Sequence, residues 1–189
     1  MSTPAFLKSL QAIDPASAQG AQKEILDRAV QQVGFLPNMY ANMANAPAVL
    51  STYLHGYSLF RTESGLSPAE QEVVFLAISQ VNGCNYCTAA HSMLADKKSG
   101  VPAAVLNAIR RGEPVPDARL AALHRLSTEM VKTQGRPSAE TVETFLSLGF
   151  SERDVLYIVL AIAVKTLSNF SNHAFATPVD EVFAAYRVE

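Results

Sequence analysis

The sequence predicts an all-α fold, with helices over most of the chain. Apolar residues recur at helical spacing, most clearly within residues 21–33 and 120–130. Helix start signals precede such runs. Ser67, for example, stands before Pro68 and Glu70, which together form a serine cap, a proline in the first turn and a glutamate that can reach back. Glycines then stand where several of the runs end, as is typical of helix C-termini.

The predicted helices follow one another with short connections. Start and stop signals predict five helices with both ends, at residues 19–33, 84–98, 102–111, 117–134 and 137–148. For five others the signals predict only the start, at residues 37, 47, 68, 151 and 177. Before them, residues 1–17 are predicted to form a short amphipathic segment and a turn. The sequence EPVPD at 113–117 is the clearest linker in the chain.

Size and composition predict a single globular domain over residues 1–189. Of these residues 49% are hydrophobic, which is enough for a substantial core. Fifteen basic and seventeen acidic residues give a net charge of −2. Because this balance offers no basic surface, neither nucleic acid nor a membrane is expected as a partner.

The N-terminal stretch and the cysteine content bear on the cellular compartment. MSTPAFLKSLQAIDPAS lacks both the basic and the uninterrupted apolar segment of a signal peptide. The longest apolar run, residues 155–164, has half the length of a membrane-spanning helix. We therefore expect a cytoplasmic protein. In that reducing compartment, two cysteines spaced C-x-x-C indicate a redox or metal role rather than a structural disulfide.

The only dense cluster of reactive side chains lies in the stretch CNYCTAAH. Cys84, Cys87 and His91 fall at i, i+3 and i+7, on one face of a predicted helix and near its N-terminus. Cysteines one turn apart can meet the ~4.4–6.8 Å Cα separation of a disulfide. His91 stands one turn after Cys87, where it can accept the thiol proton and leave a stronger nucleophile.

Two effects compete over which sulfur becomes the thiolate. The positive end of the helix dipole favours Cys84 by about 0.3–1 kcal/mol. A positioned base, which here is His91 beside Cys87, contributes roughly 10²–10⁴-fold in rate. The second effect is larger, so Cys87 is the predicted attacking sulfur.

Glu72 joins this cluster only if the chain folds back on itself. Along a straight helix, twelve residues would separate Glu72 from Cys84 by about 18 Å. A reversal at residues 82–83 instead returns His91 alongside residues 75–76, about one turn from Glu72. The predicted order is an orienting carboxylate, a base, an attacking sulfur and a resolving sulfur: Glu72, His91, Cys87 and Cys84.

These residues also carry a family resemblance. Glu72, eleven intervening residues and then CNYCTAAH resemble the signature E-x(11)-C-x-x-C-x-x-x-H of the alkylhydroperoxidase D-like branch of the carboxymuconolactone decarboxylase family. The resemblance implies the all-helical alkylhydroperoxidase D-like fold and a peroxidase that reduces hydroperoxides through its cysteine pair in antioxidant defence. It implies no cofactor and no metal. Cys87 then takes the peroxidatic role, Cys84 the resolving role, and Glu72 and His91 relay protons.

The same resemblance implies partners. A hydroperoxide is the substrate, a dithiol of lipoyl or thioredoxin type is the reductant, and the chain assembles as a homo-oligomer, a trimer or a hexamer. Independently of the family, the residues within 37–60 include methionines and aromatic residues that offer an apolar surface. Such a surface is typical of core packing or of a subunit interface.

Tyr86 marks a departure from the family pattern. The best-known members carry histidine at the residue between the cysteines, where this chain has Tyr86. The resemblance places Tyr86 in the catalytic site, but a phenol with a pKa near 10 is a poor proton shuttle at neutral pH.

Other interpretations of the cysteines remain open. The two could be small core residues, although their register with His91 and Glu72 argues against coincidence. Zinc is disfavoured because positions 84 and 91 are separated by about 10 Å of helix rise and no second C-x-x-C is present. Besides a thiol peroxidase, the sequence allows a dithiol oxidoreductase that acts on a protein or small-molecule disulfide, and a decarboxylase-like or lactone-binding protein.

An internal repeat is also predicted, at an offset of 84 residues. Without gaps, FLAISQVNGCNYCTAAH aligns with VLAIAVKTLSNFSNHAF, so that serines replace both cysteines. The two halves would span about residues 37–112 and 117–189 and pack as pseudo-symmetric helical hairpins. In the second half, Asn169, Asn172 and His173 would occupy a site-like position without thiols.

Overall fold

The structure, a computed structural model, describes residues 4–188, and within that range it contains helices and no strand. The helices are α1 (Gly20–Val33), α2 (Asn38–Met43), α3 (Pro47–Glu63), α4 (Pro68–Val81), α5 (Asn85–Lys97), α6 (Ala103–Arg111), α7 (Ala118–Lys132), α8 (Ala139–Ser147), α9 (Glu152–Phe175) and the short 3₁₀ helix η1 (Glu181–Tyr186). The predicted all-α fold is confirmed.

The predicted start of α4 has the capping geometry that its sequence suggests. The Ser67 side chain accepts a hydrogen bond from the Glu70 backbone N–H, and the Glu70 carboxylate accepts one from the Ser67 backbone N–H at 2.8 Å. Ser151 and Asp154 repeat this capping box at the start of α9. Two of the N–H groups that a helix start leaves unpaired are thereby satisfied in each helix.

The predicted last helix from Thr177 is wrong in its start and its type. Only η1 forms there, beginning at Glu181. Side-chain contacts hold the preceding residues out of a helix: Thr177 Oγ1 accepts a hydrogen bond from Asn42 Nδ2 at 3.0 Å, and Asp180 Oδ1 accepts one from the Asn38 backbone N–H at 3.1 Å. The segment is therefore fixed by α2 rather than by its own helical bonds.

The second of the two predicted hairpins does not form. Residues 152–175 make up one continuous helix, α9, through the position where the repeat alignment places a turn. Gly83 adopts a positive φ of 66° in the turn between α4 and α5, whereas Leu167 stands at the aligned position in α9. A leucine has no preference for the left-handed conformation that such a turn uses, so the helix continues.

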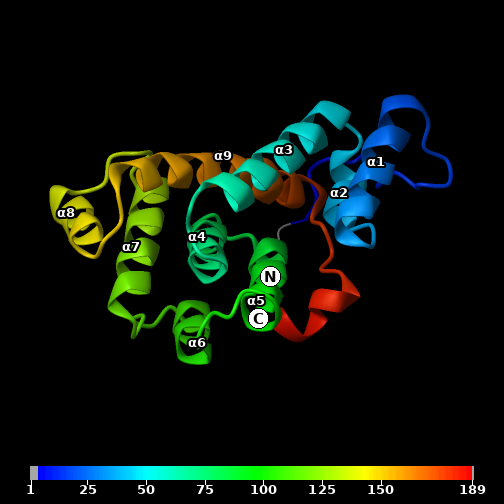
Figure 1. The fold of residues 1–189 in the computed structure, drawn as a ribbon. Coiled ribbons are helices and arrows are strands. Elements are labelled where there is room, and N and C mark those ends of the chain that lie inside the picture. Colours follow the sequence, from blue (N-terminus) through cyan, green and yellow to red (C-terminus); the bar gives the residue numbers. More distant parts are fainter. Residues whose placement is uncertain (1–3, 189) are drawn as a thin grey trace.

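Helix α9 runs along one side of the molecule, and α3, α2, α4 and α5 pack against it (Figure 1). Helix α4 lies between α7 and α5 and contacts both. One buried cluster joins side chains from α3 and α4 to others from α7 and α9, on both sides of the EPVPD segment. A second cluster, between α1, α2, α3 and α5, contains both cysteines. The division into repeated halves stays a prediction.

By length and composition alone, α9 could cross a membrane. Such a feature is weak evidence, because core helices of soluble proteins share it, and one face of α9 buries polar side chains such as Lys165 and Asn169. On the opposite face Leu156, Val159 and Phe170 are exposed. The predicted homo-oligomer and the cytoplasmic location stay predictions.

Helices α3 and α9 approach closely at Gly56. A Cβ atom at this position would lie 2.8 Å from Val164 Cγ2 and 3.7 Å from Leu160 Cδ1. Real Cβ contacts are longer than the first of these distances, and Val164 is stiff because it is branched at Cβ. The absence of a side chain at Gly56 therefore sets the spacing of the two helices.

We predict that Gly56→Ala lowers the free energy of unfolding. Alanine favours a helix by up to about 1 kcal/mol over glycine, but overpacking of a core typically costs about 1–3 kcal/mol. Urea denaturation followed by circular dichroism measures the change. The double variant Gly56→Ala/Val164→Ala should recover part of the loss, because it removes the clashing methyl groups. A Gly56→Ala protein as stable as the wild type would show that α3 and α9 have room for a side chain at this position.

Candidate active site

The hairpin of α4 and α5 positions the reactive residues. The Cys84 backbone N–H donates to the Ser79 carbonyl at 2.9 Å, which closes the turn, and Asn82 Nδ2 donates to Asn169 Oδ1 at 2.9 Å, which ties the turn to α9. Cys84 is the N-cap residue of α5, and Cys87 lies in its first turn. The hairpin that the sequence predicts is therefore present and is anchored on α9.

The hairpin brings His91 to Glu72. His91 Nδ1 lies 2.8 Å from Glu72 Oε2, and the rings of His91 and Phe75 pack with centroids 4.8 Å apart. The side chains of Glu72 and His91 are only 1% and 5% exposed. The predicted return of residue 91 to the level of residue 75 is confirmed.

Lys165 contacts the other side of the imidazole. Its Nζ lies 2.8 Å from His91 Nε2, and the lysine, on α9, is fully buried. One neutral tautomer satisfies both contacts: Nδ1–H donates to Glu72 and Nε2 accepts from Lys165. Burial and the charge of Lys165 lower the pKa of His91 despite the opposing effect of Glu72. The imidazole is thus held neutral between an anion and a cation.

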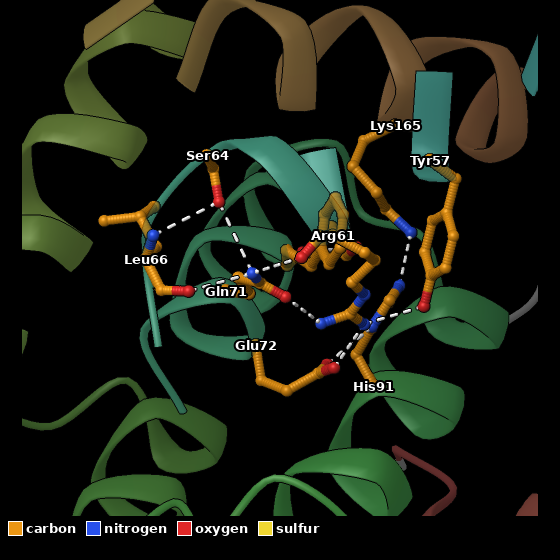
Figure 2. A network of polar contacts seen from close by, with 10 residues as sticks. Tyr57, Arg61, Ser64, Leu66, Gln71, Glu72, His91 and Lys165 are labelled. Carbon is orange, nitrogen blue, oxygen red and sulfur yellow. Dashed lines mark hydrogen bonds and ion pairs between the residues drawn. The ribbon is translucent and has the colours of Figure 1, made fainter. Parts of the chain in front are cut away.

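Arg61 completes this network from α3 (Figure 2). Its guanidinium pairs with Glu72 Oε1, donates to the Tyr57 hydroxyl at 2.7 Å and donates to Gln71 Oε1 at 3.0 Å. Burial alone would raise the pKa of Glu72, but the contacts with His91 and Arg61 outweigh it and lower that pKa. Glu72 is therefore an ionised carboxylate with a cation on one oxygen and the imidazole on the other.

The side-chain amide of Asn172, a residue of α9, contacts both cysteines. Asn172 Nδ2 is 3.3 Å from Cys87 Sγ and 3.8 Å from Cys84 Sγ, and Ser168 Oγ is 3.8 Å from Cys87 Sγ. Both thiols are free, with the residues 1% and 2% exposed. An amide donor aimed at both sulfurs suits a negative charge on either one.

The surroundings separate the two thiols in acidity. Burial alone would raise the pKa of the Cys87 thiol, but the hydrogen bond from the Cys84 thiol and the charge of Lys165 hold it well below its usual value. The hydrogen bond to Cys87 and burial raise the pKa of the Cys84 thiol. The surroundings therefore favour the thiolate at Cys87 and the protonated thiol at Cys84.

The link between His91 and Cys87 differs from the sequence-based expectation. Both imidazole nitrogens have other partners, and in the described part of the chain no hydrogen bond joins His91 to either sulfur. Of the charges that lower the pKa of the Cys87 thiol, that of Lys165, on a neighbouring helix, has the largest effect. The role of His91 as the base for Cys87 stays a prediction.

An apolar cavity of about 450 Å³ opens onto Cys87. Its walls also include His91 and Lys165, and the ring of aromatic side chains around it consists of Phe35, Tyr40, Tyr53, Tyr57, Tyr86 and Phe183. Binding sites for small organic molecules have this size and this largely apolar lining. The cavity can therefore bring a small, partly aromatic molecule to the Cys87 sulfur.

Tyr86 has a defined partner. Its hydroxyl donates to the Asp180 carboxylate, and its ring packs edge-on against Phe183, with centroids 6.1 Å apart. Burial and the contact with Asp180 raise the pKa of Tyr86, so its hydroxyl stays protonated at neutral pH. The contacts tie α5 to the segment before η1, and the predicted catalytic role of Tyr86 stays untested.

Sequence reasoning missed three contributors: Lys165, Arg61 and Asn172 as a partner of the sulfurs. Lys165 had a visible signal, because it is the one charged residue between residues 154 and 176, within an otherwise apolar helix. Asn172 was assigned to a second, thiol-free position, whereas the structure places it on the cysteine pair. Nothing in the local sequence distinguishes Arg61 from a surface arginine.

Comparisons with known proteins bear on the family and on the fold. Residues 47–126 match the model of the carboxymuconolactone decarboxylase family. The fold resembles that of a peroxidase-related protein from Ralstonia eutropha JMP134, described as an alkylhydroperoxidase core (20% identity over 92% of this chain and 93% of that chain, TM-score 0.77). It also resembles that of a peroxidase-related protein from Silicibacter sp. TM1040 (24% identity over 98% of this chain and 97% of that chain, TM-score 0.71). It also resembles a cysteine-to-alanine variant of the debrominase Bmp8 in complex with 2,3,4-tribromopyrrole (14%, 96% and 97%, 0.77). A comparison with curated protein sequences gives no match.

We predict that Lys165→Met raises the pKa of the Cys87 thiol, because a positive charge that stabilises the thiolate is lost. In a Cys84→Ser background, the rate of alkylation by iodoacetamide against pH reports this pKa. At pH 7 the reaction should slow on the order of tenfold, the factor that one pKa unit represents. Lys98→Met is the control, since Lys98 lines the same cavity but is exposed. Equal profiles of alkylation rate against pH for the two variants would show that Lys165 has no specific effect on the Cys87 thiol.

We predict that stability falls as the pH is lowered from 7 to 5. The pKa of His91 is lower in the folded protein, so the unfolded chain binds more protons near its pKa of about 6.5, and stability then rises with pH. The lowered pKa of Glu72 stabilises the fold above about pH 4.5, and this contribution is lost as the pH falls through the folded value. Urea denaturation at each pH measures both effects.

His91→Gln should reduce the slope of the stability profile between pH 7 and pH 5, since it removes one of the two histidines, with His124, whose pKa the fold lowers. His55→Gln, at an exposed position on α3, is the control and should keep the wild-type slope. An unchanged slope in His91→Gln would contradict the neutral, buried imidazole.

Proposed function

We propose, from the match of residues 47–126 to the carboxymuconolactone decarboxylase family and from the geometry around Cys87, that this protein reduces hydroperoxides through a dithiol–disulfide cycle of Cys87 and Cys84. One observation carries the proposal most strongly. Cys87 Sγ lines the apolar cavity and receives the Asn172 amide at 3.3 Å, in a setting that lowers the pKa of its thiol. A buried, activated thiolate at the end of a substrate-sized cavity suits nucleophilic attack.

In the first step, the Cys87 thiolate attacks the outer oxygen of the hydroperoxide. The O–O bond breaks, Cys87 becomes a sulfenic acid, and the departing oxygen leaves as an alkoxide that takes up a proton. Lys165 and His91 both line this cavity and form a hydrogen-bonded pair. The Lys165 ammonium can stabilise the developing negative charge and supply that proton, and the neutral His91, which accepts a hydrogen bond from it, orients it.

In the second step, Cys84 resolves the sulfenic acid. Its sulfur attacks Cys87 Sγ, the S–O bond breaks, water leaves and the disulfide forms. Asn172 Nδ2 contacts both sulfurs, so the same amide can stabilise negative charge on either sulfur during this step. Two electrons from an external dithiol then restore the pair.

Arg61 and Glu72 act on this chemistry through His91. The paired carboxylate fixes the ring orientation and keeps Nδ1 protonated, so that Nε2 faces Lys165. Gln71 holds the guanidinium in turn, and its own amide donates to the Leu66 carbonyl at 2.9 Å (Figure 2). These are positioning residues, comparable to the carboxylate of a catalytic triad.

A reductive dehalogenation is the second candidate. The debrominase with a similar fold binds a brominated pyrrole, and the cavity beside Cys87 here is lined by Tyr40, Tyr53 and Tyr57, which suit a flat, aromatic ligand. Both reactions would consume two electrons from the cysteine pair. Release of bromide from 2,3,4-tribromopyrrole, with no consumption of cumene hydroperoxide, would favour dehalogenation over peroxide reduction.

We predict that the two cysteine variants fail at different steps. Cys87→Ser should abolish the reaction with the first equivalent of cumene hydroperoxide, because the nucleophile is missing. Cys84→Ser should react once and accumulate a sulfenic acid at Cys87, which dimedone labels and mass spectrometry locates. Loss of the first reaction in Cys84→Ser, with its retention in Cys87→Ser, would reverse the assigned roles.

A further inference from the structure

The two sulfurs line different cavities. Cys87 lines the aromatic cavity of about 450 Å³, and Cys84 is not part of that lining. Cys84 lines a second cavity of about 380 Å³, near the start of α5 and the end of α9, and Cys87 is not part of that lining. Tyr86 lines both, and its hydroxyl is held by Asp180. The tyrosine therefore forms part of the wall between them.

Polar side chains make up part of the lining of the second cavity, and among the described residues none of the lining residues is Asp, Glu, Lys or Arg. Its lining includes amides, a hydroxyl, an imidazole and an aromatic ring: Asn82, Asn85, Asn172, Thr177, His173 and Phe6. Two buried polar atoms of this lining, Asn172 Oδ1 and His173 Nε2, have no hydrogen-bond partner in the described residues. Asn172 itself is only 4% exposed. Buried polar groups normally have partners, so these two atoms indicate that the cavity takes a ligand with hydrogen-bonding groups.

We propose that this second cavity is the entrance for the reductant, a small uncharged dithiol that attacks Cys84 of the Cys84–Cys87 disulfide. Peroxide and reductant then reach the pair from separate cavities. The inference rests on the proposed function in one respect, namely that the disulfide is an intermediate of the cycle.

The exchange balances as follows. A thiolate of the reductant attacks Cys84 Sγ and forms a mixed disulfide, the bond between Cys84 and Cys87 breaks, and its electron pair leaves on Cys87 as a thiolate. The second thiol of the reductant loses its proton and attacks the reductant's own first sulfur. Cys84 is expelled and takes up a proton. The reductant leaves as a cyclic disulfide, oxidised by two electrons, and the protein pair is reduced by two.

The leaving group favours this direction of attack. In thiol–disulfide exchange, the sulfur whose thiol has the lower pKa leaves faster. Two contacts that do not depend on the Cys84 thiol favour Cys87 as the leaving sulfur: the Asn172 amide lies 3.3 Å from Cys87 Sγ and 3.8 Å from Cys84 Sγ, and the charge of Lys165 opposes the effect of burial and lowers the pKa of the Cys87 thiol. Attack on Cys84 therefore expels the better leaving group, and Cys84 is the sulfur that the second cavity exposes.

The size and the lining of the cavity set the class of reductant. Cys84 is only 1% exposed, so a thiol on a folded protein surface cannot reach it without a change of shape, whereas a slender molecule can. The uncharged lining offers no partner for an ionic group. A dithiol completes the second attack within one molecule, at a high effective concentration, whereas a monothiol needs a second molecule in the same space.

Reduction is measured on the full chain with the disulfide formed by diamide, so this measurement needs no reaction with peroxide, and oxidation by cumene hydroperoxide is measured separately on the reduced protein. Asn85 and Gln32 are exposed and line only the second and only the aromatic cavity, respectively. Asn85→Trp should slow reduction by dithiothreitol about tenfold or more, since exchange rates depend on access, and leave oxidation by cumene hydroperoxide unchanged. Gln32→Trp should show the opposite pattern. His55→Trp, on the exposed face of α3, should change neither rate.

A direct measurement on the wild type supports or overturns the inference even if a tryptophan variant does not fold. The diamide-oxidised protein is treated with 2-mercaptoethanol, quenched with acid and digested, and mass spectrometry locates the mixed disulfide. We expect it on Cys84, and its presence on Cys87 would overturn the inference. Faster reduction by reduced thioredoxin than by dithiothreitol at equal concentration would contradict the assignment of a small dithiol as the reductant. If peroxide fails to form the disulfide, the proposed peroxide reduction is contradicted, and the entry route of the reductant is tested separately.

Discussion

The chain of buried contacts from Arg61 through Glu72 and His91 to Lys165 is the interaction on which the site depends. Each member has the next within hydrogen-bonding distance, and three of the four are almost fully buried. Two cations and a carboxylate of this kind are costly to bury unless they are paired, and here the neutral imidazole separates the carboxylate from the lysine. The network leaves the positive charge of Lys165 on the side of the cysteines, where it lowers the pKa of the Cys87 thiol.

The fold serves this network by bringing four helices to one place. Helix α3 provides Arg61, α4 provides Glu72, α5 provides His91 and both cysteines, and α9 provides Lys165 and Asn172. Because α9 contacts α3, α4 and α5, a change in its position moves the lysine and the amide together relative to the sulfurs. Gly56 matters for chemistry as well as for stability in this respect, since it sets the distance between α3 and α9.

Sequence patterns predict the local part of this arrangement and miss the distant part. Capping signals and glycines locate α4, α5 and α9, and helical spacing places Cys84, Cys87 and His91 on one face. The hairpin turn then brings Glu72 to His91. Lys165 and Asn172 meet the site only through packing between helices about 75 to 85 residues apart in the chain, which no local period encodes. The predicted second hairpin fails for a local reason, since Leu167 continues a helix where Gly83 ends one.

The proposed cycle requires that a reduced Cys84–Cys87 pair transfer two electrons to a hydroperoxide. Its most direct test is a single turnover of the reduced, full-length protein with one equivalent of cumene hydroperoxide, followed by thiol counting and intact mass spectrometry. We expect that the hydroperoxide becomes the alcohol, that both thiols disappear, and that the protein loses the mass of two hydrogen atoms through a bond between Cys84 and Cys87. Persistence of both thiols with the hydroperoxide unconsumed would contradict the proposed cycle.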